Sequence, residues 1–216
     1  MIPWLADVLS SRPKALALSA GNRALCYSEL AEAAARRAST LQAAGVRPSS
    51  RVALALGADP LENALWIHAL LGHGAAFVPL SPNVPSARRD RLLRRLDVHA
   101  LVSFLPDTEP ELTNCAVIDA RKLPERGPDP AWPGRDRRDP ASTAFIVLTS
   151  GSDAEPKLVP LTLAQLDAGI RATIRRLHLN ADDQWLCCMP LDHIAGLAIL
   201  LRALRSLDKA EEAMKP

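Results

Sequence analysis

The chain has 216 residues, of which 48% are apolar, 23% charged and 4% aromatic, a composition that excludes an intrinsically disordered protein. A single domain of this length buries roughly 70% of the surface of its unfolded chain, so neither a disulfide nor a metal is required to stabilise it. The net charge is +2, from 26 basic and 24 acidic residues, and this balance argues against nucleic acid or a membrane surface as a partner.

Short β-type runs alternate with longer helical runs, and this alternation predicts an α/β fold with parallel-sheet layers flanked by helices. Near the N-terminus a hairpin is expected to turn at Gly21-Asn22, and Ser28 is placed to cap a helix that ends at Gly45. The later elements expected in this half are a strand at 51–56, a helix after Pro60, a strand at 77–80, an amphipathic helix at 86–96 and strands at 99–104 and 115–119.

Residues 121–140 are rich in proline and glycine, which interrupt helices and strands. Residues 121–140 contain five prolines and two glycines among ten charged residues, which predicts an exposed connection. We therefore expect an N-terminal α/β subdomain at 1–120, this connection, an α/β segment bearing a phosphate loop at 141–207 and a tail at 208–216.

The segment after the connection begins with a buried strand at 143–148, a polar loop at 149–157 and a second strand at 158–161. A helix then opens at Thr162, with Gln165 three residues later in the pattern of a capping box.

The polar loop contains small hydroxyl residues, one glycine and one lysine, namely Thr149, Ser150, Gly151, Ser152 and Lys157. Such a loop offers backbone N–H groups, hydroxyls and an ammonium group to a polyphosphate. A Walker-type phosphate loop is disfavoured, because Pro156 has no N–H where that motif needs glycine and Leu158 is no ligand for Mg²⁺. The alternative is a plain turn whose hydroxyls bond to nearby backbone groups.

The loop resembles the phosphate loop of the acyl-adenylate-forming enzymes, which include acyl-CoA synthetases, aryl-CoA ligases and nonribosomal peptide adenylation domains. Further segments resemble the same family in the same order, at 25–30, 45–54, 74–82 and 189–196. The resemblance covers nearly the whole chain, as far as Leu204, and is nearest to the CoA-ligase branches. Asp153 and Ala154 depart from the usual Thr-Gly of the family, and Leu158 replaces a common glycine.

The resemblance implies the N-terminal portion of an AMP-forming acyl-CoA synthetase or ligase. Such an enzyme activates a small carboxylic acid with ATP and Mg²⁺ as an acyl-adenylate, and then passes the acyl group to CoA or a carrier-protein thiol. It implies that the five loop residues bind the nucleotide and that His193 and Gly196 border the acyl pocket. The family's remaining catalytic regions would follow Pro216, so no catalytic residue is assigned and the chain is expected to be incomplete on its own.

A second hypothesis is a non-catalytic truncated remnant or interaction module of that family. Such a chain would associate with itself or pair with the missing C-terminal half. Apolar surface that the missing half would cover favours association of this kind.

Other candidate sites are weaker. His193 has the alternative role of a histidine at the edge of the core, bonded to backbone. A catalytic dyad with Asp192 is rejected, because adjacent residues rarely point at each other. Cys187 and Cys188 fall in an apolar run at 185–189 that predicts a buried strand, and the arginines at 88–95 are expected on the solvated face of a helix.

The four cysteines, at positions 26, 115, 187 and 188, have neither the Cys-x-x-Cys pattern nor the spacing of metal ligands, so the sequence predicts no metal site and no disulfide framework. The first twenty residues lack a basic segment before an apolar run, which argues against a signal peptide. Residues 64–80 contain no Asp, Glu, Lys or Arg but include two histidines and a proline, and this stretch is taken as a buried helix and a strand. We therefore expect a cytoplasmic protein without a membrane anchor.

Overall fold

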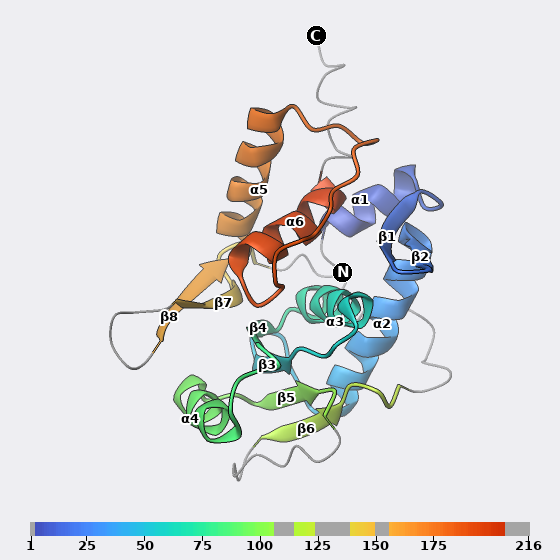
Figure 1. The fold of residues 1–216 in the computed structure, drawn as a ribbon. Helices are drawn as coiled ribbons and strands as arrows, with labels where there is room; N and C mark the ends of the chain where they lie inside the picture. The colour runs from blue at the N-terminus through green and yellow to red at the C-terminus, as the bar shows by residue number, and fades with distance from the viewer. Residues whose placement is uncertain (1–2, 106–114, 124–138, 150–155, 206–216) are drawn as a thin grey trace.

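The computed structural model describes residues 3–105, 115–123, 139–149 and 156–205 (Figure 1). Its helices are α1 (Pro3–Ser11), α2 (Tyr27–Ala43), α3 (Pro60–His73), α4 (Ser86–Leu96), α5 (Leu163–Leu177) and α6 (Ile194–Arg205). Its strands are β1 (Leu16–Ala20), β2 (Arg23–Cys26), β3 (Arg51–Ala55), β4 (Ala76–Leu80), β5 (Ala100–Ser103), β6 (Ala116–Asp119), β7 (Thr143–Thr149) and β8 (Lys157–Thr162).

Within the described residues, six strands form one sheet in the order β6-β5-β3-β4-β7-β8. Strands β6, β5, β3, β4 and β7 run parallel, and β8 is antiparallel to β7. The predicted α/β fold with a parallel sheet flanked by helices is therefore confirmed. Because β4 pairs with β7, one sheet crosses the expected connection at 121–140, and the division of the chain there stays a prediction.

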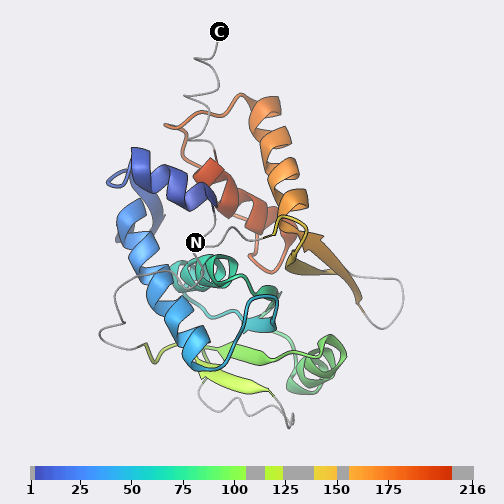
Figure 2. The ribbon, with the colours of Figure 1, turned by 180° about the vertical axis from the view of Figure 1, so that it is seen from behind.

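The central strands have apolar side chains on both faces. On β3, Val52 and Leu54 pack with α2 and α3 in the larger cluster, whereas Ala53 and Ala55 belong to a smaller cluster with α4. Figure 2 shows α2 and α3 together on one side of this sheet. Successive side chains of a strand point to opposite faces of the sheet, and both faces of β3 are covered. This explains why every residue of β3 after Arg51 is apolar.

The N-terminal helices differ from the prediction. Cys26 rather than Ser28 is the N-cap residue of α2, and its N–H donates to Glu29 Oε2 at 2.8 Å. The glutamate carboxylate thus satisfies the backbone at the helix start, and Ser28 lies within the first turn. Helix α1 was not expected, although the buried side chains of Trp4, Leu5 and Val8 share one face of it.

Helix α5 begins as predicted. Thr162 Oγ1 accepts from the N–H of Gln165 at 3.1 Å, and Gln165 Oε1 accepts from the N–H of Thr162 at 2.9 Å. This reciprocal pair is the expected capping box.

The segment 184–190 passes alongside α6 and forms neither helix nor strand (Figure 1). The Arg202 guanidinium lies 4.7 Å from the Trp185 ring centre, and Cys187 Sγ lies 3.7 Å from the Gly196 carbonyl oxygen. Cys187 and Cys188 are nevertheless exposed, so the predicted buried strand at 185–189 is wrong. The described residues provide no neighbouring strand to cover this segment, and burial of an apolar run requires such a cover.

Gly196, in the first turn of α6, lies directly against the backbone of this segment. A Cβ atom at position 196 would lie 2.6 Å from the Met189 carbonyl oxygen and closer still to that of Pro190. Only a residue without a side chain allows this approach.

We predict that Gly196→Ala destabilises the protein by about 2 kcal/mol, because overlap with rigid backbone outweighs the better helix propensity of alanine. Gly169→Ala in α5 is the matched control, since nothing lies within 4 Å of a Cβ atom there, and it should stabilise by up to about 1 kcal/mol. Urea unfolding measures both. Equal effects of the two substitutions would show that the contact at Gly196 is unimportant.

Helix α3 is buried over most of its length, and no helix of the described residues is long and apolar enough to cross a membrane. His68, in the middle of α3, is 1% exposed, and neither of its ring nitrogens has a hydrogen-bond partner. Burial disfavours the imidazolium and lowers the pKa of His68 to about 4. The fold therefore requires this histidine to be neutral.

We predict that the free energy of unfolding falls by about 2 kcal/mol between pH 7 and pH 5. The unfolded chain takes up a proton at His68 below about pH 6.5, whereas the folded chain does so only near pH 4. Stability is therefore full above pH 6.5 and is lost as the pH falls towards 4. Urea unfolding at pH 7, 6 and 5 tests this, and His68→Leu should flatten the profile. A variant profile as steep as the wild-type one would assign the loss to other groups.

Candidate phosphate site

The carboxyl edge of the sheet is where the candidate phosphate loop begins. Strands β3, β4, β5 and β7 run parallel, so their last residues lie at one edge. Strand β8 returns antiparallel, and Lys157 at its start is paired with Thr149 at the end of β7. Ligands of open α/β sheets bind outside the carboxyl ends of the strands. The fold therefore brings the first and last residues of the predicted loop together at an edge suited to ligand binding.

Two of the five predicted loop residues lie in the described part of the chain. Thr149 is half-buried, and Lys157 is exposed. The exposed ammonium of Lys157 and the hydroxyl of Thr149 suit an anion such as phosphate. The ammonium can pair with the anion without first breaking a buried ion pair. Ser150, Gly151 and Ser152 lie outside the described residues, so their phosphate contacts stay predictions.

The strand pair beneath the loop is held by apolar packing. Leu148 and Leu158 are paired one step inward from the loop, and both contact the smaller cluster that contains α4. Next to them Ile146, also in that cluster, is 7% exposed. Packing of this kind restricts the positions of Thr149 and Lys157 more than the loop residues alone would.

The second predicted site lies on a different element. His193 precedes α6, where its N–H donates to the Pro190 carbonyl at 3.1 Å and its carbonyl accepts from the N–H of Leu197 at 3.2 Å. Its side chain is exposed, whereas Gly196 is buried beneath the backbone of residues 189–190. The structure thus brings His193 and Gly196 together in one turn and gives the glycine a packing role. Their part in an acyl pocket stays a prediction.

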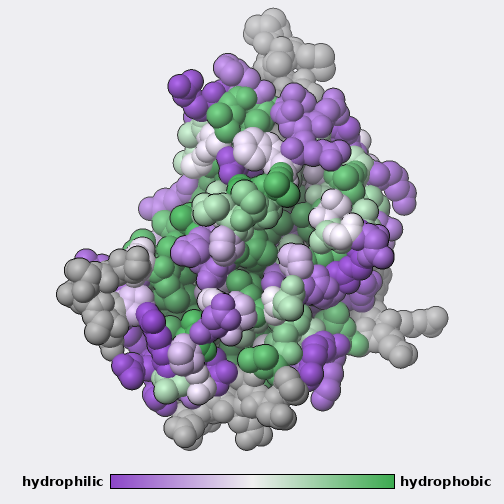
Figure 3. All heavy atoms as spheres, viewed as in Figure 1, coloured by the Kyte–Doolittle hydropathy of each residue, from purple (hydrophilic) through white to green (hydrophobic). Residues whose placement is uncertain are grey.

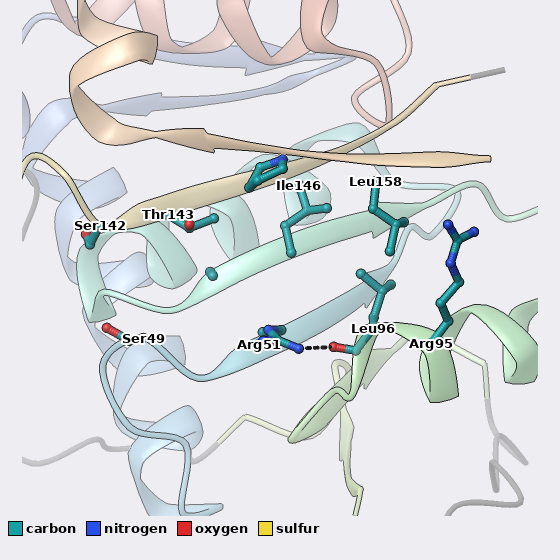
Figure 4. Close-up of a pocket in the computed structure, with 10 residues that line it drawn as sticks. Ser49, Arg51, Arg95, Leu96, Ser142, Thr143, Ile146 and Leu158 are labelled. Carbon is teal, nitrogen blue, oxygen red and sulfur yellow. Dashed lines mark hydrogen bonds between the residues drawn. The ribbon is translucent and has the colours of Figure 1, made fainter. Parts of the chain in front are cut away.

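A cavity of about 450 Å³ on the α4 side of the sheet was not expected from the sequence. Figure 4 shows Arg51 from β3 and Arg95 from α4 at its lower rim, below Ile146 and Leu158 from β7 and β8. The Arg51 Nη1 donates to the Leu96 carbonyl at 2.9 Å. Arg95 is one of the arginines at 88–95 that were expected on a solvated helix face, and Arg51 precedes an apolar strand, so no local pattern linked the two.

The described residues contain no group of three or more His, Cys, Asp or Glu side chains that could hold a metal ion. Mg²⁺ prefers carboxylate oxygens and phosphate oxygens. The residues at the loop therefore fit a phosphate group, and none of the described residues is assigned to Mg²⁺.

Comparison with known proteins identifies the family to which this chain belongs. A family model described as AMP-binding enzyme matches residues 5–206. A 2-succinylbenzoate–CoA ligase of Listeria monocytogenes serovar 1/2a is 28% identical over 204 residues, which are 94% of this chain and 43% of the ligase. Phenyloxazoline synthase MbtB of Mycobacterium tuberculosis is 29% identical over 195 residues, 90% of this chain and 14% of the synthase.

Solved structures agree. O-succinylbenzoate coenzyme A synthetase (MenE) from Bacillus subtilis in complex with AMP superposes with a TM-score of 0.80 at 24% identity, covering 94% of this chain and 53% of MenE. The same enzyme in complex with ATP and magnesium ion gives a TM-score of 0.81 at 23% identity. The chain spans about half or less of each of these proteins. It therefore belongs to the AMP-binding, adenylate-forming enzyme family, and it corresponds to the family's N-terminal part.

Proposed function

We propose that this chain provides the ATP phosphate-binding part of an AMP-forming acyl-CoA synthetase or ligase. The observation that supports this most directly is the pairing of Thr149 with Lys157, which places a hydroxyl and an exposed ammonium at the two ends of one loop. MenE has been solved with ATP and magnesium ion, which supports the same ligands here.

In the reaction we propose, an oxygen of a small carboxylic acid attacks the α-phosphorus of ATP. The bond from that phosphorus to the bridging oxygen breaks, and pyrophosphate leaves. Lys157 would lie beside the β- and γ-phosphates and stabilise the negative charge that the leaving pyrophosphate gains. The hydroxyls of Thr149, Ser150 and Ser152 would donate to phosphate oxygens, and the small side chain of Gly151 would allow the backbone to approach them.

CoA or a carrier-protein thiol is the proposed acceptor of the acyl group. His193 and Gly196 are proposed to border the pocket that binds the acyl group. MenE bound to a product analogue named OSB-NCoA supports a CoA ligase. The similarity of this chain to a nonribosomal peptide synthetase, hkm11 of Aspergillus hancockii, supports a carrier protein. A reducing compartment such as the cytoplasm suits the four free cysteines.

ATP binding is tested by thermal unfolding with and without millimolar ATP. If ATP is present at ten to one hundred times its Kd, we expect the Tm of the wild type to rise by about 3–8 °C. Lys157→Ala should lose most of this rise, because it removes the cation from the phosphates. Lys14→Ala, at another exposed lysine, is the matched control and should keep it.

An unchanged wild-type Tm at millimolar ATP would contradict the proposal, and so would a rise that Lys157→Ala retains. Pyrophosphate release with a panel of carboxylic acids then tests the chemistry. We expect none from the 216-residue chain alone, since the chain spans about half of MenE.

A second candidate function is that of an interaction module, and the segment 184–190 favours it. Leu186 is 82% exposed, Met189 43% and Trp185 38%. Figure 3 shows apolar surface over the middle of the face that carries α6. No backbone hydrogen bond joins residues 184–189 to another described segment. Unpaired backbone beside apolar side chains is a template for association, with a second copy or with the portion of the fold that relatives carry beyond this match.

Association is tested by sedimentation velocity between about 1 and 100 μM. We expect the wild type to form larger species as its concentration rises, and Leu186→Lys to stay monomeric, because the charge opposes burial of the segment. Leu177→Lys, at a leucine 49% exposed at the end of α5, is the control and should behave as the wild type. Association that survives Leu186→Lys would exclude the segment as the interface.

A further inference from the structure

One arginine of α4 reaches the phosphate loop. Arg95 Nη1 donates to the Pro156 carbonyl oxygen at 2.8 Å, between residues 61 positions apart. Arg95 also lines the cavity beside Leu158, the residue after Lys157 (Figure 4). The sequence predicted only a solvated face for the arginines of this helix.

We propose that Arg95 is a positioning residue for Lys157, an inference that rests on the proposed function. The carbonyl of Pro156 and the N–H of Lys157 belong to one planar peptide group. A hydrogen bond to that carbonyl therefore fixes the orientation of the peptide from which Lys157 extends. Arg95 acts on the lysine through this peptide and does not itself contact the phosphates.

The hydrogen bond from Arg95 restrains Pro156, the residue just outside the hydrogen-bonded ladder of β7 and β8. The ladder between β7 and β8 extends as far as the pair Thr149 and Lys157. Pro156 comes immediately before that pair and has no N–H, so its carbonyl is the one backbone group through which it can be bonded. A charged donor makes a stronger hydrogen bond than a neutral one. The guanidinium of Arg95 supplies such a donor at this position.

The helix that carries Arg95 is itself well anchored. Leu92, Leu93 and Leu96 of α4 are 5%, 0% and 3% exposed, and they pack with Ile146 of β7 in the smaller apolar cluster. The bond from Arg95 therefore joins Pro156 to a helix that is packed on the sheet.

The neighbouring arginine provides the comparison. Arg94 is exposed like Arg95 and carries the same charge on the same helix. Arg94→Met removes that charge while leaving the bond to Pro156 intact. Arg95→Met removes the bond and keeps an unbranched apolar side chain. The difference between the two variants separates the local contacts of Arg95, among them the bond to Pro156, from the long-range attraction of a cation for ATP.

The test uses the 216-residue chain in two measurements. The first is the NMR signal of the Lys157 amide in protein labelled with ¹⁵N-lysine, which contains five lysines, with Lys157→Arg to assign the signal. We expect Arg95→Met to move this signal without ATP, Arg94→Met to leave it unmoved, and Arg95→Lys to restore it in part.

The second measurement is the Kd for ATP by calorimetric titration. We expect Arg95→Met to weaken binding roughly threefold to tenfold and Arg94→Met less than twofold. Without ATP, Arg94→Met should leave the Tm unchanged and Arg95→Met should lower it by about 1–3 °C, because only Arg95 donates to the Pro156 carbonyl.

The outcomes separate the two proposals. If the Lys157 amide does not respond to Arg95→Met, or if the two variants bind ATP equally, the positioning role of Arg95 is wrong. If the wild type binds no ATP while the amide signal does respond, the proposed function fails and the link between Arg95 and the loop stands.

Discussion

The antiparallel pairing of β7 with β8 is the constraint on which the candidate site depends. Strand β7 continues the parallel sheet beside β4, so it ends at the carboxyl edge. A second parallel strand would have placed Lys157 at the opposite edge, one strand length away. Because β8 returns directly, Lys157 lies opposite Thr149, and a short loop joins two strand ends rather than crossing the sheet.

Helix α4 connects that constraint to the rest of the fold. Its apolar side packs with Ile146 and with Leu148 and Leu158, the pair below the loop. Its arginine at position 95 bonds to the last residue before β8. The same packing that stabilises this face of the sheet thus determines where Arg95 meets Pro156, so the stability of this face and that contact depend on one cluster.

The segment before α6 leaves an apolar surface exposed. Residues 184–190 lie against α6, and Gly196 permits the close approach of their backbone. Their outer side is apolar and exposed, and Leu186 is the most exposed of the large hydrophobic residues that the structure describes. Relatives such as MenE carry about as much chain again outside the match, and an exposed apolar segment of this kind is a surface suited to association.

The alternation of strands and helices and the capping box at Thr162 could be predicted from the amino-acid sequence, because periodicity and capping depend on residues a few positions apart. The apolar run around Cys187 and Cys188 predicted a buried strand, but both cysteines are exposed. Burial depends on whether another segment covers the run, and the local sequence does not specify that. The pairing of Lys157 with Thr149 and the hydrogen bond from Arg95 to Pro156 became visible in the folded chain alone. These contacts join distant segments, and their partners are selected by sheet order and packing, which no local pattern encodes.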